Sequence, residues 1–311
     1  MSANVDFTLG LTQGVAWPWP IAVYLFLAGI SGGALAISCL IRIYRRQKEV
    51  TPLFAAASLI AFVCIALGMV CLVADLTNPL YFWRILVFYN PTSVMSLGVM
   101  ALLVYIPLTF ILTLVCFADK MARCSVCAPI VPLVKRCNCA MGVLTWLALV
   151  FAVTICAYTG FLISALIRFP LINTAVLPAL FVASGLSAGA AAAKLIASGV
   201  LGAARTSEDV EILHKAEWPI MVSELLCIFM IAVSLIGGNE SAQLAASAFV
   251  TGPWAVDFWV GTMAVGFGIP ILLAFVKESS AAFYASAVAG IVGMMCLRLF
   301  ILYAGQMNPV I

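Results

Sequence analysis

The stretch "WPWPIAVYLFLAGISGGALAISCL" occupies residues 17–40 and carries no charged side chain. A helix needs roughly 20 apolar residues to cross the hydrocarbon core of a bilayer, so this stretch is long enough to span it. Tryptophan prefers the membrane interface, and proline is tolerated in the first turn of a helix. We therefore expect a membrane helix whose first turn lies at the interface.

The composition of the whole chain agrees with this interpretation. Of its 311 residues, 65% are hydrophobic and only 9% are charged, with a mean hydropathy of +1.21. Ordinary soluble domains are about 25% charged, so this chain cannot cover itself with a polar surface. We expect an integral membrane protein whose main partner is lipid. A net charge of +3 is too small to indicate nucleic acid as a partner.

Seven further apolar stretches of similar length follow the first, which predicts an all-α protein with eight transmembrane helices. Positive charges concentrate in alternate loops, with four in residues 42–51 and four in residues 118–139. The positive-inside rule places these loops in the cytoplasm and both termini in the periplasm of a bacterial inner membrane. The predicted spans are 18–41, 52–75, 92–117, 140–166, 176–200, 217–237, 254–276 and 280–304.

A weak internal repeat suggests how the spans are grouped. "GISGGA" at residues 29–34 recurs as "GLSAGA" at residues 185–190, and both copies lie on odd-numbered spans. We expect one transmembrane domain, residues 1–311, made of two four-helix bundles at about 17–167 and 175–304 and related by an axis along the membrane normal. The alternative is that both copies only serve tight packing, because small residues are common where membrane helices touch.

Haem and metal sites have little support in the sequence. The single histidine, His214, lies in a predicted cytoplasmic loop, whereas a haem held by two histidines needs ligands within the membrane. Cys124, Cys127, Cys137 and Cys139 have spacing near that of a zinc or iron–sulfur site. The Cys-x-Cys half is tighter than usual, and cytoplasmic thiols stay reduced. We predict no haem and free thiols, with a metal at this cysteine loop as the alternative.

Ionisable side chains within the spans are the strongest functional candidates, because each costs roughly 2.5–3.5 kcal/mol to insert at a helix centre. Asp75 ends the second span and Glu224 lies in the inner half of the sixth, and neither has an opposite charge nearby in sequence. Three others have simpler explanations. Asp257 can be interfacial, Lys194 can extend to the cytoplasmic surface, and Arg298 can be a structural ion-pair partner.

Polar and aromatic residues gather at the predicted outer face, around the carboxylate that ends the second span. A carboxylate, a phenol and aromatic walls at the edge of the hydrocarbon suit an amphipathic ligand with a redox-active head and an apolar tail. A quinol has these properties, and its protons need an acceptor when its electrons leave. The predicted quinone-binding residues are Asp75, Trp83, Arg84, Tyr89, Tyr158 and Thr159.

At these residues the chain resembles the NrfD/PsrC-type (polysulfide reductase NrfD) family of quinol-reactive membrane subunits. The likeness is stronger to NrfD-type members than to the longer polysulfide reductase subunits, and it extends in order along nearly the whole chain. The matching pieces are "WPWPIAVYLFLAGISGG", "DLTNPLYFW" followed by Arg84, "TSVMSLGVM", "AYTGFLISAL", "HKAEWPIMVSE" and "RLFILYAGQ".

The resemblance implies a haem-free inner-membrane subunit of an anaerobic respiratory complex. It would carry electrons between menaquinone or ubiquinone and a periplasmic, ferredoxin-like [4Fe–4S] subunit, which serves a catalytic subunit that is a multihaem cytochrome c or a molybdopterin enzyme. It would not be the catalytic headpiece, but quinol oxidation would occur here, with Asp75 and Tyr158 as the catalytic residues. Some relatives carry an Asn and a His in the first span that this chain lacks.

The resemblance also implies a proton path. Glu224 matches an intramembrane acid of the family, and we predict that it connects the quinone region to the cytoplasm together with Lys194 and Arg298. The alternative is that Glu224 only forms an ion pair with Lys194, which lies in the same leaflet. In that case its loss would reduce stability and leave charge movement unchanged.

A secondary transporter is the alternative function, since eight spans, buried charges and a repeat suit that class as well. Transporter sites usually lie at the membrane midplane beside broken helices. Here the polar residues lie mainly towards the outer face, and the span centres lack Gly-Pro breaks apart from Gly268 and Pro270. The quinol-reactive subunit is therefore the favoured prediction.

Overall fold

The computed structural model describes residues 17–307 except 77, 89, 124–127 and 276–278, and this part of the protein is helical without a β-strand. Eight helices are long and apolar enough to cross a membrane, which confirms the predicted number. The spans are α1 (Trp19–Tyr44), α2 (Pro52–Ala74), α4 (Val94–Cys116), α7 (Met141–Ser164), α8 (Leu177–Gly199), α9 (Glu208–Ile236), η5 (Asp257–Gly268) continued by α11 (Ile269–Ala274), and α12 (Ser280–Gly305).

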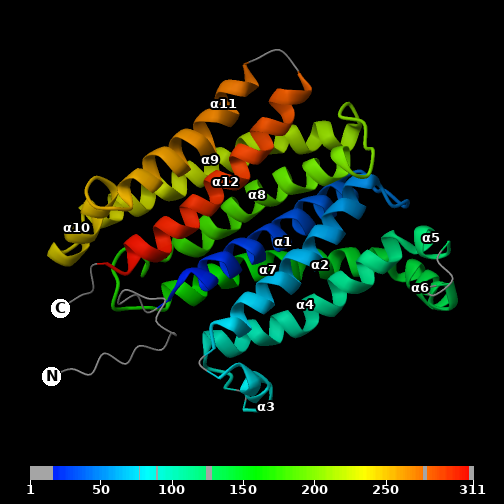
Figure 1. Cartoon of the computed structure of the whole chain (residues 1–311), viewed down its shortest axis with the longest axis horizontal. Helices are drawn as coiled ribbons and strands as arrows, with labels where there is room; N and C mark the ends of the chain where they lie inside the picture. Colours follow the sequence, from blue (N-terminus) through cyan, green and yellow to red (C-terminus); the bar gives the residue numbers. More distant parts are fainter. Residues whose placement is uncertain (1–16, 77, 89, 124–127, 276–278, 308–311) are drawn as a thin grey trace.

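Short helices form the connections at the two ends of the molecule. Figure 1 shows α3 at the end where the chain begins and finishes, and α5 and α6 at the opposite end. The connecting helices are η1 (Pro79–Tyr81), α3 (Arg84–Val87), α5 (Ala118–Met121), η2 (Ala128–Ile130), α6 (Val131–Arg136), η3 (Cys137–Ala140), α10 (Glu240–Ala246) and η4 (Ser247–Phe249).

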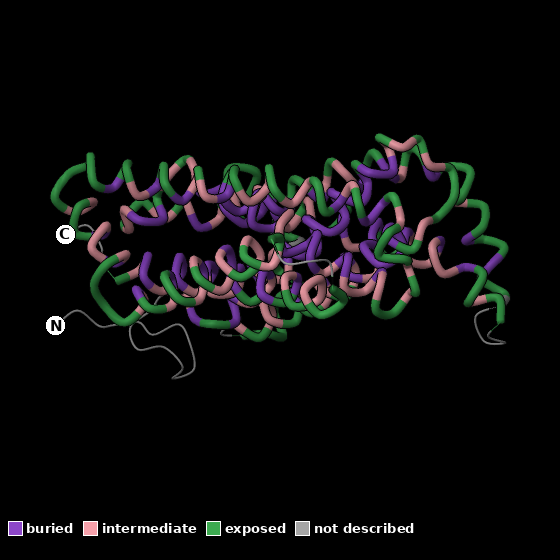
Figure 2. The backbone as a smooth tube through the Cα atoms, turned by 90° about the horizontal axis from the view of Figure 1, so that it is seen from above, coloured by how far each residue is buried: buried purple, intermediate pink, exposed green. Residues whose placement is uncertain are grey.

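The helices α1 and α8 lie at the centre of the bundle and pack against each other, α7 and α12. α2 packs on α1 and α9 packs on α8, and their outward sides carry exposed apolar residues such as Leu67 and Phe229. Buried residues face inwards and exposed ones outwards along the helices (Figure 2), as expected for a protein surrounded by lipid. The division into two four-helix bundles and the side of the membrane that holds the termini stay predictions.

The described ends of the protein meet at one end of the bundle. The N–H of Trp17 donates to Oε1 of Gln306 at 3.0 Å, and Nε2 of Gln306 donates back to the carbonyl of Trp17 at 3.3 Å. α1 starts directly after Pro18, and Pro20 lies in its first turn, as the sequence predicts. These hydrogen bonds tie the start of the first span to the end of the last.

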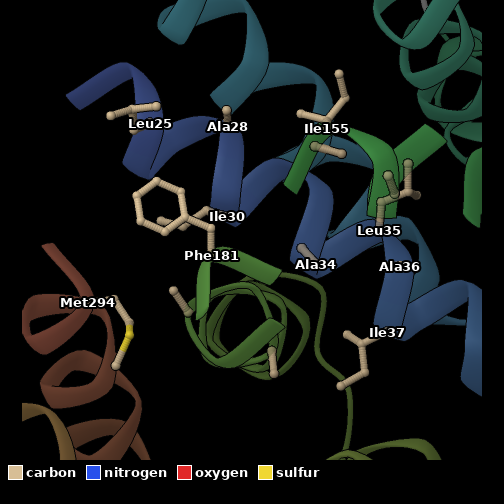
Figure 3. Close-up of a cluster of buried hydrophobic side chains, with 14 of the residues drawn as sticks. Leu25, Ala28, Ile30, Ala34, Leu35, Ala36, Ile37, Ile155, Phe181 and Met294 are labelled. Atoms are coloured by element: carbon tan, nitrogen blue, oxygen red, sulfur yellow. The ribbon is translucent and has the colours of Figure 1, made fainter. Parts of the chain in front are cut away.

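The two copies of the small-residue motif form the contact between α1 and α8. A Cβ atom on Gly33 would overlap the carbonyl of Gly185, and a Cβ on Gly189 would lie 2.9 Å from the Cα of Gly33. Only glycine allows the two backbones to approach this closely. Around this crossing, Ala34 and Ile37 of α1 share one buried cluster with Phe181 of α8 (Figure 3).

The sixth span begins earlier than predicted, at Glu208 instead of residue 217. Its first turn contains Glu208 and Asp209, and acidic residues stabilise a helix N-terminus by their interaction with the helix dipole. Arg45, which caps the end of α1, forms ion pairs with both carboxylates. An apolar pattern cannot reveal this polar turn, because it is held by a distant cation.

The seventh span also differs from the prediction. It is expected as a regular helix, but residues Asp257–Gly268 form a π-helix, and a regular α-helix follows only from Ile269. Two features favour the change. Pro270 has no N–H and cannot donate to the preceding turn. In addition, Gly266 lies directly against α12, where a Cβ atom would come within 2.8 Å of the Cα of Gly293.

Candidate functional site

Tyr158 lies in α7, where helix packing fixes the position of its ring. The residue is only 9% exposed, and its ring fills the space in front of Gly98 of α4, so that a Cβ atom on Gly98 would overlap it. Thr159 is fully buried, and its hydroxyl donates to the carbonyl of Cys156 at 2.7 Å. The hydroxyl of Thr159 is therefore used within its own helix, whereas the phenol of Tyr158 lies at a contact between helices.

Tyr24 of α1 is a further candidate residue, which the sequence interpretation missed. It is 1% exposed, its hydroxyl has no hydrogen-bond partner, and it is close enough to Tyr158 to interact electrostatically. Its ring contacts α2 at Gly68, where a Cβ atom would lie 3.3 Å from Cδ2. A tyrosine hydroxyl in an otherwise apolar stretch is itself a signal, because buried tyrosines usually find a partner.

Asp75 follows the last residue of α2, two helical turns after Gly68, and its N–H donates to the carbonyl of Cys71 at 3.1 Å. The residue is half-buried, and this desolvation raises the pKa of its carboxyl above the ordinary value. A carboxyl with a raised pKa exchanges protons closer to neutral pH, which suits a proton acceptor. Asp75 and Arg84 are both described, and no ion pair joins them.

The other predicted outer residues lie on the connection between α2 and α4, beyond the ends of the helices. Trp83 is 46% exposed, and the guanidinium of Arg84 stacks on the ring of Tyr81, 4.4 Å from its centre. They therefore project from the bundle and do not pack against Tyr158. Tyr89 lies outside the described residues, so its predicted role stays a prediction.

The predicted proton-path residues lie in the second half of the chain. Lys194 is 2% exposed and does not reach the surface, and its Nζ lies 2.5 Å from Oε1 of Glu217. The other carboxylate oxygen of Glu217 is 2.9 Å from Nδ1 of His214. Lys194 therefore does not extend to the surface as expected. The alternative, an ion pair between Glu224 and Lys194, is also wrong, because Glu217, two helical turns nearer the start of α9, binds Lys194 instead.

Glu224 and Arg298 form a second polar group deeper in the same half. Glu224 is fully buried with no hydrogen-bond partner for either carboxylate oxygen. Arg298 stacks on Phe181, 3.6 Å from the ring centre, and donates to its carbonyl at 3.3 Å, while Nη1 has no partner. The two residues interact electrostatically without direct contact.

Comparison with known proteins identifies the family. A family model described as polysulphide reductase, NrfD matches residues 8–310. The protein belongs to the NrfD family. A polysulfide reductase chain from Wolinella succinogenes is 38% identical over 301 residues, which cover 94% of this protein and 95% of the relative. NrfD from Escherichia coli is 35% identical over 311 residues, which cover 95% of this protein and 96% of the relative.

This NrfD-family protein is thus similar to a polysulfide reductase component and to an NrfD protein at nearly the same level, and the predicted family is confirmed. A shorter match joins it to a selenate reductase subunit from Mesobacillus selenatarsenatis, with 27% identity over 95 residues, 30% of this protein and 22% of the relative. Together with the eight spans, family membership establishes a multi-pass membrane protein.

The cysteine loop of this family member is only partly described. The thiols of Cys137 and Cys139 donate to the carbonyls of Leu133 and Arg136, at 3.9 and 2.8 Å. Cys124 and Cys127 lie outside the described residues. Within the described part of the protein, no three His, Cys, Asp or Glu side chains are grouped as metal ligands. Free thiols at this loop, with a metal as the alternative, therefore stay a prediction.

Proposed function

We propose that this protein is the quinol-reactive membrane subunit of a bacterial respiratory oxidoreductase in the inner membrane. Two relatives, named as components of polysulfide reductase and selenate reductase, support the assignment to such a complex. The observation that carries the quinol site is the buried pair Tyr24 and Tyr158. The ring of Tyr24 lies against Gly68 of α2, two helical turns before Asp75. Three helices supply these groups at the same end of the bundle.

The residues present fit the head group and tail of a menaquinol or ubiquinol. The buried Tyr24 hydroxyl lacks a hydrogen-bond partner, and buried polar groups rarely stay unpaired. An oxygen of the quinone ring would supply the missing hydrogen bond. The apolar tail would lie along the lipid-facing sides of α2 and α4, where Val70 and Leu97 are exposed.

The chemistry follows from these groups. Oxidation of a quinol to the quinone releases two electrons and two protons. The Asp75 carboxylate takes one proton from the quinol hydroxyl, and the phenols of Tyr24 and Tyr158 hold the ring oxygens while the second proton passes to water at the outer face. The two electrons would pass to an iron–sulfur cluster of a ferredoxin-like periplasmic partner, which would supply a catalytic subunit of the multihaem cytochrome c or molybdopterin type.

The exposed connection between α2 and α4 is the proposed docking surface for the iron–sulfur partner. It presents Arg84, stacked on Tyr81, beside apolar side chains such as Leu80 and Phe88. A photo-crosslinking amino acid at position 84 is expected to link to the iron–sulfur subunit in the assembled complex. The same group at Arg205, which is exposed at the opposite end of the bundle, should not. Crosslinks from position 84 to lipid alone would contradict the docking surface and the predicted topology.

Glu224, Arg298 and Lys194 are proposed to carry protons between the quinone region and the cytoplasm. The unpaired carboxylate of Glu224 supports a relay, since Lys194 is already bound by Glu217. Glu224→Gln should lower the membrane potential generated during turnover in proteoliposomes, because glutamine cannot exchange a proton, while the fold survives. Glu211→Gln is the control, since Glu211 is exposed and pairs with Lys215. Equal potentials and rates in wild type and Glu224→Gln would rule out the relay.

A further inference from the structure

Thr262 differs from every other threonine in the described parts of the spanning helices. It is 0% exposed, and its hydroxyl has no hydrogen-bond partner. In the other cases the hydroxyl donates to a carbonyl three or four residues earlier in the same helix, which satisfies it without help from elsewhere. Those threonines are Thr109, Thr113, Thr145, Thr154 and Thr159.

The π-helix explains the difference. In η5 each N–H bonds to the carbonyl five residues earlier. The carbonyls of the preceding turn therefore have different positions relative to a threonine hydroxyl than they have in an α-helix. The same geometry sets Thr262 one turn from Asp257, on the same side of the helix. Oδ2 of Asp257 is also buried without a partner. Two unpaired oxygens therefore lie one turn apart near the outer end of the seventh span.

The neighbouring helix α12 packs against η5 beside Asp257. The thiol of Cys296 donates a hydrogen bond to the Asp257 carboxyl. Gly261 fits between them, since a Cβ atom there would lie 2.6 Å from Sγ of Cys296 and 3.3 Å from Oδ1 of Asp257. Arg298, two residues further along α12, faces Phe181 of α8 instead, so no cation of α12 neutralises this carboxyl.

Below Thr262 the two helices touch. Gly266 and Gly293 allow a backbone contact, in which a Cβ atom on Gly266 would come within 2.8 Å of the Cα of Gly293. On the other side of this contact lies a cavity of about 30 Å³, lined by Lys194, Glu217 and Gly266 among others. The contact between Gly266 and Gly293 therefore separates the polar side chains of Asp257 and Thr262 from the polar cavity, which lies nearer the predicted cytoplasmic end.

We propose that Asp257 and Thr262 bind an internal water molecule, and that this water and the Asp257 carboxyl hold an exchangeable proton. A hydroxyl both donates and accepts and a carboxylate accepts, so one water can bond to Thr262 Oγ1 and Asp257 Oδ2 together. Buried waters typically satisfy such otherwise unpaired groups. The site uses none of the proposed quinol residues and does not depend on quinol oxidation. It gives the second half of the protein its own proton-binding site on the predicted outer side.

Radiolytic footprinting of the full-length protein in lipid nanodiscs tests for the water. X-rays generate hydroxyl radicals from bound water in place, and these oxidise nearby sulfur even when a scavenger removes radicals from bulk solvent. Cys296 should be oxidised severalfold faster than Cys156, a buried thiol of the same protein that donates to the carbonyl of Gly29. Thr262→Val, which keeps the side-chain shape and removes the hydroxyl, should reduce the rate at Cys296 to that at Cys156.

Carbodiimide labelling tests for the proton, because dicyclohexylcarbodiimide modifies protonated carboxyls in apolar surroundings. The peptide containing Asp257 should be labelled in the wild type, less so as the pH is raised, and not in Asp257→Asn.

Equal oxidation of Cys296 and Cys156 in the wild type would overturn the water site, without need of any variant. Absence of label at every pH would overturn the exchangeable proton, and label that is lost on adding sodium at constant pH would indicate a sodium ion instead. Both measurements are made without quinol, so they are independent of the proposed function.

Discussion

Asp75→Asn is expected to lower quinol oxidation by the assembled complex about 100-fold or more, the range that a positioned proton acceptor contributes. Asparagine keeps the size of the side chain but cannot accept a proton at neutral pH. Because burial raises the pKa of the Asp75 carboxyl, the wild-type rate should increase with pH through a midpoint above the ordinary aspartate value of about 3.9. Only the ionised carboxylate accepts the quinol proton, and this step of the profile should vanish in the variant.

Asp119→Asn is the matched control for Asp75. Asp119 is an exposed carboxylate at the opposite end of the bundle, where it pairs with Lys135 at 2.9 Å. Its replacement should leave the rate unchanged. Quinol turnover is measured with purified complex at equal subunit content, so that assembly and catalysis are separated. A near-normal rate in Asp75→Asn would remove Asp75 from the proposed mechanism.

Gly98→Ala should have the next largest effect, because the added Cβ atom would occupy space that the ring of Tyr158 already fills. Either the ring or the backbone of α4 must move, at a cost of about 1–3 kcal/mol in the free energy of unfolding. Displacing a ligand-positioning group by about 1 Å can cost on the order of 100-fold in rate. We therefore expect a large loss of quinol oxidation with α4 still formed, measured by turnover and by thermal unfolding in the same preparation.

Gly142→Ala separates this contact from the general effect of alanine in a helix. Gly142 lies in the first turn of α7, and nothing lies within 4 Å of a Cβ atom built on it. Alanine there should leave the rate unchanged and should not destabilise the helix, since alanine has the higher helix propensity. If Gly98→Ala turns over quinol as fast as Gly142→Ala, the position of Tyr158 does not matter for the reaction.

The predicted site residues separate in the structure for a reason that sequence order hides. Asp75 and Trp83 are near in sequence, but α2 ends at Ala74 and the backbone then leaves the bundle, so Trp83 is exposed. Tyr24 is distant in sequence from Tyr158 but close in space, because α1 packs against α7. Which face of a helix meets its neighbour depends on its rotation, and apolar runs of nearly uniform hydropathy carry no information about rotation.

Sequence order also does not show which residues form ion pairs within the membrane. From the sequence, Glu224 is the alternative ion-pair partner of Lys194, since both lie in one leaflet of the predicted topology. In the structure α9 begins at Glu208 and places Glu217 beside Lys194, leaving Glu224 to face Arg298 without contact. Arg45 forms ion pairs with Glu208 and Asp209 in the first turn of α9, and these pairs join the ends of two helices far apart in the sequence.

The sequence alone determined that this protein crosses a membrane eight times, because each span is recognised by the free energy of transferring its own residues to lipid, which needs no knowledge of neighbours. It also determined the family, since matching pieces are spread along its whole length. Only the tertiary structure decided that Tyr24 lies near Tyr158, that Glu217 binds Lys194, and that Thr262 of the π-helix has no hydrogen-bond partner within the protein. These features depend on glycine contacts and backbone hydrogen bonds between or within packed helices, which exist only once the helices have assembled.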